Sequence, residues 1–148
     1  MDKAVIKECG DCNLLIYGDF ININEITRDL GLKPTLIAEK GKPILRSGSS
    51  ALGYCQTNGW FYSISFDDKG SFPNVLRLFL SQVSSLKSKL QMLVTKTEGT
   101  DIFITISVRS DYAQMSLEIA PELQKLISEL GFPLRISILS FGMVGDDE

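Results

Sequence analysis

The chain has 148 residues, about the size of one domain, since single domains usually run to about 100 to 150 residues. Hydrophobic residues make up 44% of the chain and charged residues 22%, so a packed core is expected rather than a disordered chain. The net charge of −3 offers no basic surface for a phosphate backbone. We therefore expect no nucleic-acid partner.

The cysteine count and the amino-terminal residues indicate a cellular compartment. Three cysteines, an odd number, fit a reducing environment better than a disulfide framework. The start, MDKAVIKECGDCNLLIYG, lacks the basic flank and the apolar stretch of a signal peptide. No run approaches the roughly 18 apolar residues that a membrane helix needs. We expect a cytoplasmic protein without a membrane partner.

The first elements of the chain are a strand, a capped helix and a second strand. The apolar run 14–17 predicts a buried strand. Asn22 stands three residues before Glu25, a spacing that lets Asn22 cap the first free amides of a helix while Glu25 reaches back to the amide of the cap. An amphipathic helix follows and ends at Gly31. Residues 35–38 form the second predicted strand.

The middle of the chain predicts a loop, a strand and a long helix. Residues 40–58 are polar and rich in turn residues, and the aromatic and β-branched run 60–66 is typical of a strand with one wetter face. From 72 to 95, apolar residues recur at spacings of three and four, which predicts a helix with a place for a kink near Ser84 and Ser85. This stripe also resembles a coiled coil, but its serines make poor charge pairs between helices, so we favour a helix packed on a sheet.

The end of the chain predicts a strand, a helix and a last strand. Residues 101–109 alternate β-branched residues with others and form the clearest strand of the chain. A helix over 121–130 starts at a proline and ends at a glycine, and a strand follows over 134–141.

The order of elements is therefore β-α-β-β-α-β-α-β. The first six elements match a ferredoxin-like split βαβ arrangement, to which one α-β unit is appended. We predict an α+β fold in a single domain over 1–148, with an amino-terminal extension at 1–12 and a flexible acidic tail at 142–148.

No catalytic set can be assembled from these residues. The chain has no histidine, which removes the commonest general base, the serine and papain-like triads, and the usual zinc ligand. Cys9 and Cys12 have CxxC spacing, but they precede a strand and lie beside carboxylates. We favour incidental cysteines over a redox pair or a metal site. The carboxylates fall on polar helix faces, and no glycine-rich phosphate loop is present. We expect no enzyme activity, cofactor or metal.

Residues from strand ends, turns and aromatic positions are candidates for binding a partner. The favoured role of Asp19 is to place its charge at the amino end of a helix, and the alternative is a ligand position at a strand end. Trp60 is favoured as the core anchor of its strand over an exposed anchor for a partner. Asp67 and Asp68 form an acidic turn, which either keeps the protein soluble or is complementary to a basic site on another protein. The candidates are Asp19, Tyr54, Trp60, Tyr62, Asp67 and Asp68.

The sequence also resembles a bacterial domain-of-unknown-function family over roughly residues 13 to 141. The residues that carry this resemblance are Gly18, Asp19, Ile26, Thr27, Leu30, Gly31, Pro34, Gly41, Gly59 and Trp60. Some members of the family look like immunity proteins of polymorphic or contact-dependent toxin systems. The family has no agreed catalytic residues, so none is carried over. One departure is Ala120, which stands where a Ser or Asp cap of the last helix is expected.

The leading hypothesis is therefore a non-catalytic protein-binding module, a bacterial immunity protein that neutralises a cognate toxin domain by direct binding. It depends on the lack of a catalytic set, the acidic balance and the resemblance. The alternative is a small-molecule-binding or regulatory domain, with a pocket between the sheet and the loop 40–58 that Trp60 would line.

Overall fold

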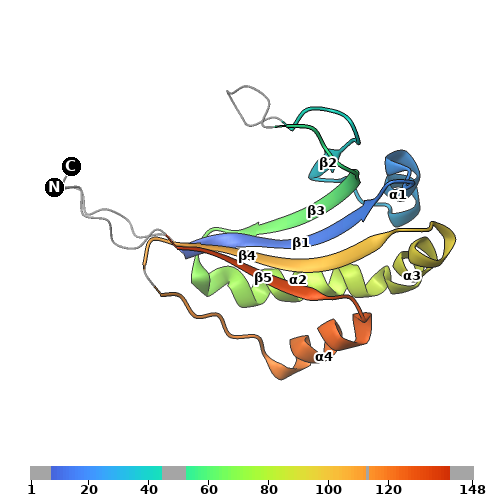
Figure 1. The fold of residues 1–148 in the computed structure, drawn as a ribbon. Helices are drawn as coiled ribbons and strands as arrows, with labels where there is room; N and C mark the ends of the chain where they lie inside the picture. Colours follow the sequence, from blue (N-terminus) through green and yellow to red (C-terminus); the bar gives the residue numbers. More distant parts are fainter. Residues whose placement is uncertain (1–7, 45–52, 113, 141–148) are drawn as a thin grey trace. The chain divides into compact units, whose positions relative to one another are not determined.

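The computed structural model describes residues 8–44, 53–112 and 114–140 (Figure 1). Its strands are β1 (Glu8–Gly18), β2 (Leu36–Ala38), β3 (Asn58–Phe66), β4 (Asp101–Ser110) and β5 (Leu134–Ser140). Its α-helices are α1 (Ile23–Leu30), α2 (Phe72–Ser85), α3 (Lys87–Lys96) and α4 (Pro121–Leu130), and a 3-10 turn over Lys69–Ser71 precedes α2. No helix in these ranges combines the length and the apolar character that crossing a bilayer requires.

The strand order confirms the predicted α+β fold. The sheet has the order β2-β3-β1-β4-β5, so β3 lies between the two strands that α1 connects, as in a split βαβ arrangement. β2 and β3 are antiparallel, with Leu36 opposite Phe61. The appended α4–β5 unit extends the sheet, because β5 pairs with β4 in parallel, with Ile106 opposite Ile136.

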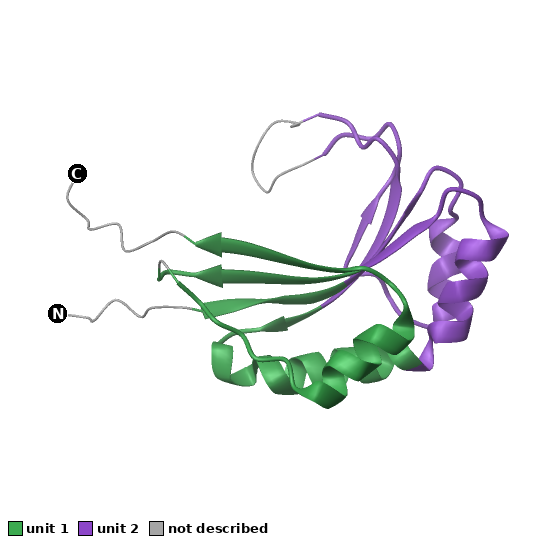
Figure 2. Cartoon of the chain, turned by 60° about the horizontal axis from the view of Figure 1, so that its bottom comes forward, with its two compact units in different colours: residues 1–13, 64–84, 104–148 green, residues 14–63, 85–103 purple. Residues whose placement is uncertain are grey.

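The chain divides into two compact units, which Figure 2 shows in different colours. Unit 1 comprises residues 1–13, 64–84 and 104–148, and unit 2 comprises residues 14–63 and 85–103. β1, β3 and β4 each pass from one unit to the other along the chain.

The core of unit 1 lies between its strands and the helices α2 and α4, which lie on the same side of those strands (Figures 1 and 2). The rings of Phe66 and Phe72 meet edge to face, with centroids 5.2 Å apart. The predicted apolar stripe of α2 packs inside this core, which confirms the helix-on-sheet interpretation over the coiled coil. The buried residues of α2, β4 and α4 in this core include Leu76, Phe79, Leu80, Val83, Ile104, Ile106, Val108, Leu123 and Leu130.

The predicted long helix is interrupted where the kink was expected. α2 ends at Ser85 and α3 begins at Lys87. Leu86 between them has φ −102° and ψ 3°, which is not a helical conformation. Ser84 and Ser85 stand directly before this break.

The predicted amino-terminal extension is wrong for residues 8–12, which belong to β1. The sequence ECGDC of these residues has low strand propensity. Pairing with neighbouring strands, and not local propensity, decides whether such a segment is a strand. Gly10 fits here because β4 passes very close to it: a Cβ at this position would collide with the carbonyl oxygen of Ser107 and lie 2.7 Å from the ring of Phe66. The predicted acidic tail lies outside the described residues.

Candidate functional site

Trp60 and Tyr62 contact each other in unit 2, and Trp60 is a core residue. The Trp60 side chain has no exposed surface, and its indole N–H donates to Oγ1 of Thr27 at 3.0 Å. The half-buried ring of Tyr62 stacks on it with centroids 6.5 Å apart. Complete burial corrects the assignment of Trp60 to a partner-binding surface, and it agrees with the favoured role of a core anchor.

Asp19 holds a local structure together beside the strand ends. Its carboxylate lies 3.4 Å from Nζ of Lys40. The hydrogen bond from Thr57, followed by the hydrogen bond and charge of Lys40, lowers the pKa of Asp19. The Asp19 carbonyl oxygen accepts from the side-chain amide of Asn58 at 3.3 Å. These contacts connect the turn after β1 to the start of β3, which is a structural role.

The remaining candidates lie on the surface and make local contacts. The side chain of Tyr54 is 63% exposed, and the residue forms an isolated β-bridge with Pro43. Asp67 and Asp68 are exposed. Asp68 accepts from the backbone N–H of Ser71 at 2.9 Å, and so caps the turn before α2.

A cleft between α1 and α3 brings together a set of residues that sequence reasoning did not select. It has a volume of about 500 Å³ and lies within unit 2. We call it the α1–α3 cleft, and its lining residues are Phe20, Asn22, Glu25, Ile26, Arg28, Asp29, Leu30, Lys89, Met92, Leu93, Lys96 and Thr97.

The apolar part of the α1–α3 cleft has a buried portion and an exposed rim. Ile26 and Leu30 of α1 are buried, and Leu93 of α3 is half-buried. On the rim, Phe20 is 75% exposed and Met92 is 67% exposed. Large apolar side chains are therefore exposed within one concave site.

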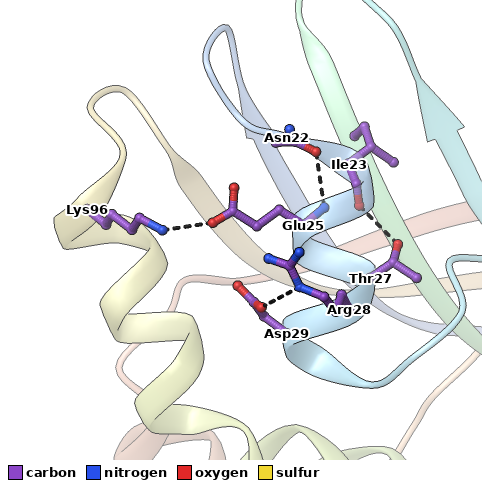
Figure 3. A network of polar contacts seen from close by, with 7 residues as sticks. All are labelled: Asn22, Ile23, Glu25, Thr27, Arg28, Asp29 and Lys96. Atoms are coloured by element: carbon purple, nitrogen blue, oxygen red, sulfur yellow. Dashed lines mark hydrogen bonds and ion pairs between the residues drawn. The ribbon is translucent and has the colours of Figure 1, made fainter.

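Charged side chains of α1 and α3 also line the cleft, and Figure 3 shows Glu25, Arg28, Asp29 and Lys96 among them. Nζ of Lys96 lies 2.7 Å from a carboxylate oxygen of Glu25, and this hydrogen bond and charge raise the pKa of Lys96. Arg28 and Asp29 form a second, exposed ion pair at 3.4 Å. With Lys89 the lining carries three cations and two anions, so the cleft has a slight positive excess although the whole chain is acidic.

The capping of α1 was predicted in part. Oδ1 of Asn22 accepts from the backbone N–H of Glu25 at 3.0 Å, as expected. The carboxylate of Glu25 points toward Lys96 in Figure 3 and not back to the cap. Sequence spacing suggested the reciprocal bond of a capping box, but a cation from α3 competes for the same carboxylate.

Two signals could have found the cleft in the sequence. Ile21 precedes the cap and Ile26 stands at the fourth helical position, which is the spacing of a hydrophobic staple. Both are buried, so the preceding Phe20 is free to point away from the core. Met92 lies outside the stripe that Leu90 and Leu93 continue, and so it falls on the exposed side of α3.

Cys12 is not an activated thiol in this structure. Cys12 is buried in β1, and burial followed by the charge of Asp11 raises its pKa to about 12. The thiol therefore stays protonated at neutral pH, whereas a nucleophile or metal ligand must be a thiolate. Cys9 and Cys55 are half-buried free thiols. In the described ranges, no three Cys, Asp or Glu side chains form a cluster that could hold a metal ion.

Between residues 7 and 140 the sequence matches the profile of a domain of unknown function, DUF4279. The chain belongs to the DUF4279 family. No curated protein and no solved structure matches it. In this DUF4279 domain, several residues that carried the family resemblance have structural roles. Ile26 and Leu30 are buried, and Thr27 accepts the hydrogen bond of the Trp60 indole. Gly31 ends α1 with a φ of 66°.

Proposed function

We propose that this DUF4279 domain is a non-catalytic binding module that holds another protein in the α1–α3 cleft. The observation that carries the proposal is the exposure of Phe20 and Met92, 75% and 67%, on the rim of a cleft with buried apolar residues. Aromatic residues, Met and Arg are the types enriched in protein interfaces, and the cleft also contains Arg28. Phe20 and Met92 are the expected hot spots.

The ion pairs of the cleft fit the rim of such an interface. Glu25 with Lys96 and Arg28 with Asp29 are exposed, and exposed pairs contribute little to the stability of the chain itself. At an interface they would determine which partner fits and in which orientation, because like charges placed opposite each other are unfavourable. The partner surface is therefore expected to present an apolar side chain between charged groups of both signs.

The more specific proposal is that the partner is a toxin domain, which the protein neutralises as an immunity protein. Its supports are the family resemblance described from the sequence and the net charge of −3, which favours long-range attraction of a basic protein. The cleft itself has a slight positive excess, so it would contact an acidic or neutral part of that partner. The exposed acidic turn at Asp67 and Asp68 stays a candidate for that electrostatic contribution. An occluding protein needs affinity and shape, and needs no catalytic residues.

A second candidate function is the binding of a small molecule in the same cleft. A volume of about 500 Å³ falls within the range of about 300–1,000 Å³ that is typical of ligand pockets. The ligand would be largely apolar with a polar group that reaches Glu25 or Lys96. The α1–α3 cleft is not lined by Trp60, so this pocket lies elsewhere than the one predicted beside loop 40–58, part of which falls outside the described residues.

Co-expression tests the proposed function. The chain is produced together with the carboxyl-terminal domain encoded immediately upstream in its source genome, and growth rescue and co-purification are measured. We expect rescue with a stable complex for the natural chain, and loss of both for Phe20→Asp and Met92→Asp. Leu78→Asp on α2 is the matched control, because Leu78 is 51% exposed but does not line the cleft.

Two results would count against the proposal. If the upstream product is harmless or does not associate, the immunity function is wrong. If rescue survives both cleft substitutions, the partner binds elsewhere. Saturable thermal stabilisation by a metabolite, abolished by Met92→Asp and without any protein partner, would favour the second candidate.

A further inference from the structure

β5 forms one edge of the sheet and, within the described residues, this edge is less protected than the opposite one. β5 is the last strand in the sheet order, and no described strand pairs with its outer side. Six of its seven residues are exposed, and Arg135 is its one charged residue. β2, at the other edge, has three residues, and short length is a common way to protect an edge. β5 is longer, mostly aliphatic, and contains no proline or glycine.

The pairing with β4 fixes which backbone groups of β5 point outward. The N–H of Ile104 donates to the carbonyl oxygen of Pro133 at 2.9 Å, while Ile104 lies opposite Leu134. Residues of a strand direct their backbone groups alternately to its two sides. The odd-numbered residues therefore face β4, and the outward-facing residues are Leu134, Ile136, Ile138 and Ser140.

We propose that two copies of the chain pair through β5, antiparallel, about a two-fold axis at Ser137. In this register Ile136 lies opposite Ile138 of the second copy, and Leu134 lies opposite Ser140. Every outward-facing residue then meets an outward-facing residue, so each pair can exchange both hydrogen bonds. The two sheets become one continuous sheet.

The charges and the length of β5 select this register among the alternatives. With the axis at Ser137, Arg135 lies opposite Leu139 of the second copy. An axis at Arg135 would put two like charges directly opposite each other, which is destabilising. An axis at Ile136 or Ile138 would leave residues at one end of β5 without a partner. The register at Ser137 pairs all seven residues of β5 and separates the two arginines.

The side chains of this pairing continue the core of unit 1. Ile136 and Ile138 are 52% and 61% exposed. They lie opposite Ile106 and Val108 in the parallel ladder, on the face where those two residues are buried. Aliphatic pairs across the axis would bury this exposed surface, and an isologous two-fold contact is the commonest form of a homo-oligomer. The proposal is independent of the α1–α3 cleft.

Mass and cross-linking test the proposal. Light scattering after size exclusion is expected to give twice the chain mass of 16.4 kDa, with dissociation on dilution. Ile138→Lys is expected to give a monomer with an unchanged circular dichroism spectrum. Ile37→Lys, the same change on the other edge strand, is the matched control and is expected to remain a dimer. A natural chain that is monomeric at all concentrations, or a dimer that survives Ile138→Lys, overturns the proposal.

Ser137→Cys tests the register itself. Ser137 would lie opposite Ser137 of the second copy in a non-hydrogen-bonded pair. The Cα atoms of such a pair are about 4.5 Å apart, inside the range of about 4.4–6.8 Å for a disulfide. We expect a disulfide-linked dimer on mild oxidation. Ser140→Cys would lie opposite Leu134 and should not cross-link, and the natural chain measures the background from its own cysteines. Equal cross-linking of the two variants would overturn the proposed axis.

Discussion

The indole N–H of Trp60 donates to the hydroxyl oxygen of Thr27 at 3.0 Å, which joins β3 to α1 across 33 positions of sequence. Both residues belong to the set that carries the family resemblance. Trp60 is fully buried, so its N–H needs a partner inside the protein. This buried hydrogen bond therefore gives both residues a role in the fold of this chain.

Thr27→Val is expected to destabilise the chain by about 1–3 kcal/mol, because it leaves a buried donor unsatisfied. Trp60→Phe removes the donor but also leaves a void. The double variant should lose less unfolding free energy than the two single variants lose together, because the same hydrogen bond can be lost only once. Chemical denaturation of the four chains measures this coupling. Strictly additive effects would mean that the bond contributes nothing to stability.

Gly10→Ala is expected to destabilise unit 1 by about 1–3 kcal/mol, the usual cost of overpacking. The added Cβ would meet the backbone of Ser107 and the ring of Phe66, and backbone cannot move aside as a flexible side chain can. Gly41→Ala is a control with open space around it, although its φ of 82° adds a conformational cost of its own. Thermal unfolding compares the two, and an unchanged melting temperature for Gly10→Ala would contradict the close approach of β1 and β4.

Cys12 is expected to resist thiol reagents at neutral pH until the chain unfolds. Burial and the charge of Asp11 raise the pKa of Cys12 from its ordinary value of 9.0 to about 12, so the reactive thiolate is scarce in the folded state. Because the folded pKa is the higher one, its contribution to stability is fully present below pH 9.0 and is lost as pH rises toward 12. Mass spectrometry after labelling, with and without denaturant, identifies the modified residue. Fast labelling of Cys12 in the native chain would show that the thiol is accessible.

The ion pair of Asp19 with Lys40 is expected to stabilise the chain in a pH-dependent way. The pKa of Asp19 is lowered from 3.8, so its contribution is fully present above that pH and is lost as pH falls through the lower folded value. Asp19→Asn should therefore lower the melting temperature at neutral pH and have little effect in strong acid. Lys40→Met should give the same profile. A difference between Asp19→Asn and the natural chain that does not change with pH would point to a lost hydrogen bond with no contribution from charge.

Local sequence patterns predicted most of the fold, because they depend on neighbouring residues. The cap Asn22, the helix end Gly31 and the alternation of β4 are such features. The amino-terminal part of β1 was missed because Gly10 and its polar neighbours lie in a strand for reasons of sheet pairing. The sequence also left open whether the appended unit extends the sheet, which only the β4–β5 pairing decides.

The candidate site was harder to predict than the fold. Trp60 and Asp19 drew attention by residue type, and both have structural roles. The exposure of Phe20 and Met92 was not predicted, because an apolar residue beside a helix cap or within a helix is usually buried. Their exposure depends on how α1 and α3 lie side by side within unit 2, which no local spacing encodes.

The affinity of the purified partner for cleft variants tests the central claim, that this domain binds a protein through the α1–α3 cleft. Calorimetry would compare the natural chain with Phe20→Asp, Met92→Asp and the control Leu78→Asp, after circular dichroism has confirmed that each is folded. We predict that each cleft variant weakens binding by about 30-fold or more, which corresponds to a hot spot of about 2 kcal/mol, and that Leu78→Asp has no effect. Equal affinities for all four chains would contradict the claim.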